Sequence, residues 1–205
     1  MKLLICGDSY AQENYESFTW PTKLSKKYDT TNLARNGTGP QWSLMQLIDY
    51  LEHNDTKDTT VLFFVSSHTR IDLKDHPISE QWKLKYSTNK YVKWLFKNYI
   101  TTASYDQTEK DKIICLVAQY AKYFKKVLIW DIFGKKSDLE YSFLPNVTVI
   151  DKYDLYTIEY RENRPPQDHC INHLHKENHD IMYDMLDAWI EKNIAIDPKK
   201  LQKIN

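Results

Sequence analysis

Glycine is scarce in this sequence, with 4 among 205 residues. A phosphate-cradling loop needs several closely spaced glycines, and the first apolar run is followed by Gly7 alone, which argues against a nucleotide site of that kind. Net charge is also lacking, because 28 basic side chains balance 28 acidic ones, so no overall field attracts nucleic acid or an anionic membrane. No apolar run approaches the ~20 residues of a membrane-spanning helix, so no span is expected.

Cysteine is too sparse for a disulfide framework, since the 3 thiols form no Cys-x-x-Cys pair. Cys6 and Cys115 stand in apolar runs and are expected to be buried. The thiols fit a reducing compartment, and Met1 leads directly into an apolar run, which leaves no room for a signal peptide. We therefore expect a cytoplasmic or phage-encoded protein, and the Lys- and Asn-rich, Gly-poor composition suits an AT-rich bacterial or phage genome.

Short apolar runs alternate with amphipathic helical patterns along the chain. This alternation predicts an α/β fold, a flavodoxin-like three-layer α/β/α sandwich around a parallel sheet of about five strands, joined by right-handed crossovers. The run Thr59–Val65 is β-branched and aromatic throughout, so it should be buried on both faces. The predicted strands are 2–6, 31–34, 59–65, 127–130 and 147–150. Four helices are predicted: one over 20–28, one that follows a Thr38/Gln41 capping box, one near 113–124 and one that begins near Lys176.

Residues 71–104 form an aromatic-rich insertion with no sustained period in what is expected to be one domain over 1–205. Tyr and Trp number 15 and 6 in the whole chain, and such side chains suit stacking on sugars or on a partner surface. The insertion is therefore either a lid or sugar platform, or a segment that packs on the sheet.

Polar residues follow three predicted strands: Ser9 in Gly7-Asp8-Ser9, then Gly37, then Ser67. Because parallel strands end on one edge of a sheet, these residues should meet there. Gly7-Asp8-Ser9 alone is also an ordinary turn, in which Asp8 braces the loop. A serine hydrolase needs a hydroxyl nucleophile, a histidine base, a group that holds the histidine, and oxyanion donors. Together with the loop 168–173, the strand ends offer a candidate for each.

The order of these blocks resembles the SGNH (GDSL-type) hydrolases, which are esterases, lipases and carbohydrate deacetylases on a flavodoxin-like sandwich. The resemblance spans nearly the whole chain, from Gly7-Asp8-Ser9 through Asn36-Gly37 to His173, which stands six residues before His179 as in the family. It implies that Ser9 is the nucleophile and that the backbone amides of Ser9 and Gly37 are oxyanion donors. It also implies that His173 is the general base and then the acid.

Two positions depart from the family pattern. Ser67 stands where the family has an oxyanion-binding Asn, and a hydroxyl has a shorter reach. Cys170 stands where the family has the acid, three residues before the histidine. Asp168 could orient His173 instead, and otherwise a backbone carbonyl does so.

Arg70 and the histidines of the chain allow both functional and structural interpretations. Arg70 either binds a carboxylate or phosphate of the ligand or is a plain surface residue. The histidines around His173 lack the His-Glu-x-x-His zinc pattern, so neither a metal nor another cofactor is expected. His179 is expected to lie on a helix face and to bond a loop carbonyl.

The sequence thus predicts a serine esterase that hydrolyses an O-acetyl or other short acyl ester, plausibly on a carbohydrate, through Ser9 and His173. Its partner would be a small-molecule or glycan ester, and the oligomeric state stays open. The alternatives are a catalytically weakened binding module that recognises a glycan or protein, and, less favoured, a flavodoxin-like nucleotide binder.

Overall fold

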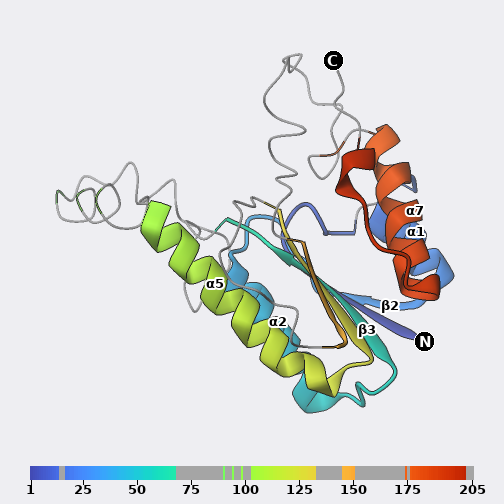
Figure 1. The fold of residues 1–205 in the computed structure, drawn as a ribbon, viewed down its shortest axis with the longest axis horizontal. Helices are drawn as coiled ribbons and strands as arrows, with labels where there is room; N and C mark the ends of the chain where they lie inside the picture. Colours follow the sequence, from blue (N-terminus) through green and yellow to red (C-terminus); the bar gives the residue numbers. More distant parts are fainter. Residues whose placement is uncertain are drawn as a thin grey trace.

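The computed structural model describes residues 1–13, 17–67, 90, 94, 98, 103–132, 145–150, 174 and 176–201, with side chains of 103–107 excepted. Its centre is a parallel sheet of five strands in the order β2-β1-β3-β4-β5 (Figure 1). The predicted α/β sandwich is therefore confirmed. The strands are β1 (Lys2–Cys6), β2 (Asp29–Asn32), β3 (Thr59–Val65), β4 (Lys126–Asp131) and β5 (Val147–Ile150).

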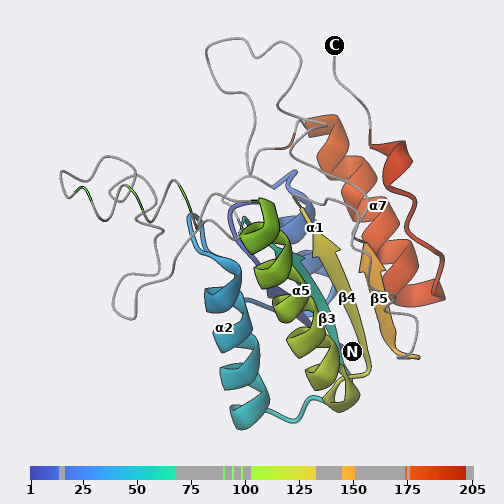
Figure 2. The same ribbon diagram turned by 60° about the vertical axis from the view of Figure 1, so that its left-hand side comes forward.

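Helices cover both faces of the sheet (Figure 2). The helices α1 (Trp20–Lys27) and α7 (Lys176–Lys192) lie on one face, and α2 (Pro40–His53) and α5 (Ala103–Tyr120) lie on the other. Successive strand residues alternate between the two faces. In β3, Leu62 and Phe64 pack toward α1 and α7, whereas Phe63 and Val65 pack toward α2 and α5. All seven β3 residues are buried, as predicted for a central strand.

The predicted second strand lies two residues too late in the sequence. Thr31–Ala34 was the expected strand, but pairing with β1 begins at Asp29, opposite Lys2. The cause is the position of β2 at the sheet edge, where alternate residues face solvent and an apolar run is not required.

The expected capping box at the start of α2 is wrong. Gly39 is the N-cap residue, and no side chain caps the helix. The Thr38 hydroxyl instead donates to the Arg35 carbonyl at 2.7 Å, which closes the preceding loop.

Leu116 on α5 is 39% exposed. The segment after Asp197 contains the short helix η3 (Pro198–Lys200), and the following Leu201 is buried against the α1/α7 side of the sheet. No helix in the described ranges is long and apolar enough to cross a membrane. The insertion at 71–104 lies outside the described residues except for 90, 94, 98 and 103–104, and the single-domain prediction stays a prediction.

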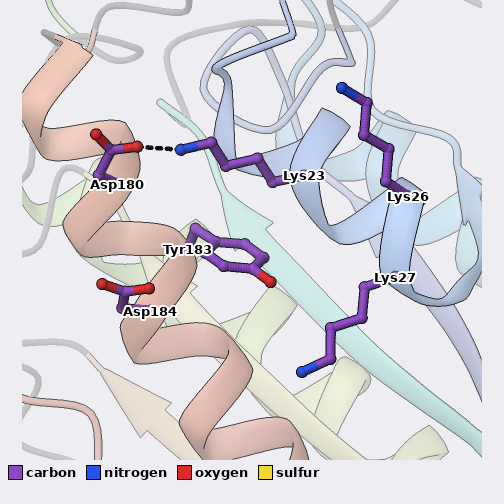
Figure 3. Close-up of a pocket in the computed structure, with 6 residues that line it drawn as sticks. All are labelled: Lys23, Lys26, Lys27, Asp180, Tyr183 and Asp184. Carbon is purple, nitrogen blue, oxygen red and sulfur yellow. Dashed lines mark hydrogen bonds and ion pairs between the residues drawn. The ribbon is translucent and has the colours of Figure 1, made fainter.

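Charged side chains line the groove where α1 meets α7 (Figure 3). Lys23 forms an ion pair with Asp180, and Lys27 bonds Asp187 at 2.8 Å. The Tyr183 ring extends from α7 toward α1, with the Lys23 ammonium 5.8 Å from its centroid. Such partly exposed ion pairs contribute only about 0–1 kcal/mol each to the free energy of unfolding. The contact between α1 and α7 is therefore stabilised mainly by its buried side chains.

His179 is the most informative of those buried side chains. It is fully buried, and its Nδ1 accepts a hydrogen bond from the Trp20 amide at 3.2 Å. Trp20 is the first residue of α1, so this bond satisfies an amide that a helix leaves open at its start. The Phe18 ring packs edge-on against the imidazole at 5.7 Å. The structure shows an amide donor at Nδ1, and this bond leaves the predicted bond to a loop carbonyl untested.

We expect His179→Ala to lower the free energy of unfolding by about 2–4 kcal/mol, because it removes both a buried acceptor and ring volume. His179→Asn keeps an acceptor near the position of Nδ1 and should lose clearly less. Urea unfolding followed by tryptophan fluorescence measures both variants. Equal losses for Ala and Asn would show that the hydrogen bond contributes nothing.

The other end of α7 is held by Lys126, the first residue of β4. Its ammonium bonds the Trp189 carbonyl and, at 2.7 Å, the Asn193 side chain. It also lies 4.2 Å from the centroid of the Trp189 ring. A cation is favourable at this position because the last carbonyls of a helix are unpaired and carry partial negative charge.

Candidate active site

The carboxyl ends of β1, β2 and β3 lie side by side in the sheet. With the strand order 2-1-3-4-5, the direction of winding reverses between β1 and β3, and ligands of such sheets bind in the crevice at this switch point. Ser9 follows β1 and Ser67 follows β3, so the two predicted hydroxyls come from the strands that flank the switch point.

The turn that carries Ser9 is tightly built. A Cβ at Gly7 would lie 2.9 Å from the Phe64 Cβ and 3.0 Å from the Ala11 Cβ, so only glycine fits without displacing β3 or the turn. Asp8 is fully buried, and its carboxylate accepts the Tyr10 amide at 3.1 Å. Asp8 therefore braces the turn, as predicted. Ser9 itself is 5% exposed, which means that neighbouring residues nearly cover it.

The loop after β2 is bonded directly to this turn. The Arg35 amide donates to the Gly7 carbonyl at 3.1 Å, and the Asn36 amide donates to the Gln12 side-chain oxygen at 2.8 Å. The Thr38 hydroxyl also reaches the Gly7 carbonyl, at 3.4 Å. The first two loops of the rim thus form one hydrogen-bonded unit.

Gly37, inside that loop, has a left-handed backbone conformation. Its φ of 79° lies in the left-handed region, where glycine is strongly favoured. Within the described residues, no hydrogen bond uses the Gly37 amide. The start of α2 lies three residues further on with no acidic side chain in its first turn. The positive end of the helix dipole therefore favours negative charge beside this amide.

Ser66 and Ser67 have different surroundings. The buried Ser66 hydroxyl donates to the Thr38 carbonyl at 3.1 Å, which ties the end of β3 to the loop after β2. Ser67 is partly exposed and comes next in the chain. Ser66 therefore makes the hydrogen bond that joins the two loops. The Ser67 side chain is the more accessible of the two serines.

Cys6 lies one residue before Gly7 and is fully buried. Burial raises the pKa of its thiol well above the usual range. A protonated, inaccessible thiol is not a nucleophile at neutral pH, so Cys6 is not a candidate nucleophile.

A buried ion pair that was not predicted from the sequence lies at the same edge of the sheet. Lys110 on α5 and Asp131 at the end of β4 are 3% and 1% exposed, and their charged groups are in contact. Asp131 pairs in the sheet with Val65, directly before the two serines. A buried charge pair is costly to desolvate, and its placement at the end of a strand is typical of functional edges. The only available signal was Asp131 at the end of an apolar run.

Three predicted site residues, His173, Asp168 and Arg70, lie outside the described residues, as does most of the histidine cluster. The residue after His173, Leu174, is 1% exposed. It belongs to the same apolar cluster as Tyr10 and Ala11, which follow Ser9. Hydrogen bonds of Arg35, Thr38 and Ser66 join the three loops that carry Ser9, Gly37 and Ser67, and the roles of all the candidate site residues stay predictions.

No family model matches the sequence, and no curated protein matches it. Among solved structures, the crystal structure of TesA aligns with a TM-score of 0.48 and 13% identity over 93% of this chain and 97% of that one. The psychrotrophic esterase EstA from Pseudoalteromonas sp., inhibited by monoethylphosphonate, aligns with a TM-score of 0.47 and 12% identity over 93% and 99%. Likeness at this level assigns no activity, so the functional argument rests on the site.

Proposed function

We propose that this protein is a serine ester hydrolase that acts on an O-acetyl or other short acyl ester, plausibly carried by a carbohydrate. The observation that carries the proposal is the rim itself: a serine on a rigid turn beside a glycine whose backbone amide is available. The sequence resemblance to SGNH hydrolases supports the same roles. The near-complete cover of Ser9 favours a small acyl group.

In the proposed reaction, the Ser9 hydroxyl attacks the ester carbonyl and forms an acyl-enzyme. The amides of Ser9 and Gly37, with the Ser67 hydroxyl, stabilise the oxyanion of the tetrahedral intermediate. His173 takes the proton from Ser9, gives it to the leaving alcohol, and then activates the water that releases the acyl group. Asp168 or a backbone carbonyl orients His173.

Two structural features support the assignment of these roles. The hydrogen bonds from Arg35, Thr38 and Ser66 fix the relative positions of the three rim loops, so the donors need little reorganisation during the reaction. Leu174 packs in the same core cluster as the residues after Ser9, which favours an approach of the two chain segments.

A fluorophosphonate probe tests the nucleophile without knowledge of the natural substrate. Because such probes bond covalently to activated serine hydroxyls, we expect a single adduct, located on Ser9 by peptide mass spectrometry. Protein unfolded in urea is the control and should not react. An adduct on another serine, or no adduct on the folded protein, would contradict the proposal.

A further inference from the structure

Among the described residues, Arg35 differs from the other cations near the rim because no acidic side chain pairs with it. It is exposed, and it is the one arginine in the described part of the chain. Lys23, Lys27 and Lys110 all form ion pairs, but within the described ranges no carboxylate lies within ion-pair distance of Arg35. Its guanidinium lies 5.9 Å from the centroid of the Trp42 ring. The aromatic face holds the cation without neutralising it.

The backbone of Arg35 is fixed beside the Ser9 turn. Its amide donates to the Gly7 carbonyl at 3.1 Å, and its own carbonyl accepts the Thr38 hydroxyl at 2.7 Å. Gly37, the proposed oxyanion donor, is two residues further along the same loop. A ligand that contacts both Arg35 and the Gly37 amide therefore binds to a loop whose main chain is already ordered. This order lowers the entropy cost of binding.

We propose that Arg35 binds a carboxylate on the alcohol portion of the substrate, so that the esterase prefers acetyl-type esters of anionic alcohols. This inference rests on the proposed function. The guanidinium fork matches the two oxygens of a carboxylate. We assign the anion to the alcohol portion because Ser9 is nearly covered, which suits a small acyl group, whereas Arg35 is exposed and so suits the larger portion of the substrate.

A matched pair of acetyl esters tests the preference. The anionic ester is 4-acetoxybenzoate and the neutral one is 4-acetoxybenzamide, which differ in the carboxylate alone. We expect Arg35→Gln to lower the ratio of their kcat/KM values about 10- to 100-fold, as for loss of charge-assisted hydrogen bonds. Arg35→Lys keeps the positive charge but lacks the guanidinium fork. Its ratio of kcat/KM values should lie between those of the wild type and Arg35→Gln. An unchanged ratio in Arg35→Gln overturns the inference.

Lys26→Gln is the control for a general loss of charge. Lys26 is an exposed residue on α1 that lines the groove of Figure 3. Within the described residues it has no ion-pair partner. The ratio should not change in this variant. An equal fall in Lys26→Gln and Arg35→Gln would show a long-range field rather than a binding contact.

A binding measurement separates this inference from the esterase proposal. Titration calorimetry compares 4-hydroxybenzoate with 4-hydroxybenzamide on the wild type and on Arg35→Gln, and it needs no turnover. We expect the wild type to bind the carboxylate about 10-fold or more tightly than the variant does. Equal binding overturns the Arg35 site even if the esters are hydrolysed. Binding that depends on Arg35, without hydrolysis, leaves the anion site standing and refutes the esterase proposal.

Discussion

Replacement of Ser9 by alanine is expected to lower kcat for p-nitrophenyl acetate on the order of 10⁴-fold, because the acyl-enzyme cannot form without the hydroxyl. The fold should persist, since the change removes one oxygen from a nearly covered side chain. A shift of the melting temperature by no more than about 4 °C is expected for a chain of this size. Steady-state hydrolysis and thermal unfolding measure the two effects on the same preparation.

Ser25→Ala is the matched control for this experiment. Ser25 lies on α1, and its hydroxyl has no hydrogen-bond partner among the described residues. This variant should hydrolyse the ester at the wild-type rate. Activity in Ser9→Ala above a tenth of the wild-type value would remove Ser9 from the proposed mechanism.

The second large effect concerns the stability of the fold. Asp131→Leu leaves the Lys110 ammonium buried without its carboxylate, and Lys110→Met leaves the carboxylate without its ammonium. Each single change is expected to lower the free energy of unfolding by about 3–5 kcal/mol. The double variant removes both charges and should be more stable than either single variant. Urea unfolding followed by tryptophan fluorescence gives the comparison.

An exposed ion pair on the same helix provides the reference. Lys112 and Glu109 are in contact on α5, with the Lys112 side chain 60% exposed. Lys112→Met should therefore change the free energy of unfolding by no more than about 1 kcal/mol. Two results would contradict the importance of burial for the stability of this pair. One is that the single variants lose no more free energy of unfolding than Lys112→Met does. The other is that the two losses simply add in the double variant.

The central strands could be predicted from the sequence because a strand buried on both faces must be apolar throughout. Thr59–Val65 was placed at its observed bounds for this reason. Val147–Ile150 was also placed at its observed bounds, although it lies at the sheet edge and is only partly buried. The edge strand β2 was shifted, because half of its residues face solvent and carry no apolar signal. The capping box at the start of α2 was misjudged, because the Thr38 hydroxyl donates to the Arg35 carbonyl within its own loop and Gly39 is the N-cap residue.

For the candidate site as well, some features could be predicted from the sequence and others could not. Ser9, Gly37 and Ser67 could be placed on one rim because strand ends in a parallel sheet are ordered by topology. The contacts that make the rim rigid could not be predicted. Ser66 and Thr38, or Lys110 and Asp131, meet only after distant segments have packed, and nothing in their local sequence specifies the partner. The roles of all six candidate residues stay predictions: Ser9, Gly37, Ser67, His173, Asp168 and Arg70.

The attachment of α7 at both of its ends has a consequence for biosynthesis. His179 bonds the start of α1 and Lys126 bonds the Trp189 carbonyl, so α7 docks onto elements that precede it in the chain. In the described part of the chain, α1 is the one helix synthesised before α7 that covers the sheet face with Phe64 and Trp130. Nascent chains that lack residues 176–201 therefore leave much of this apolar face without its α7 cover, and chaperones bind surfaces of this kind.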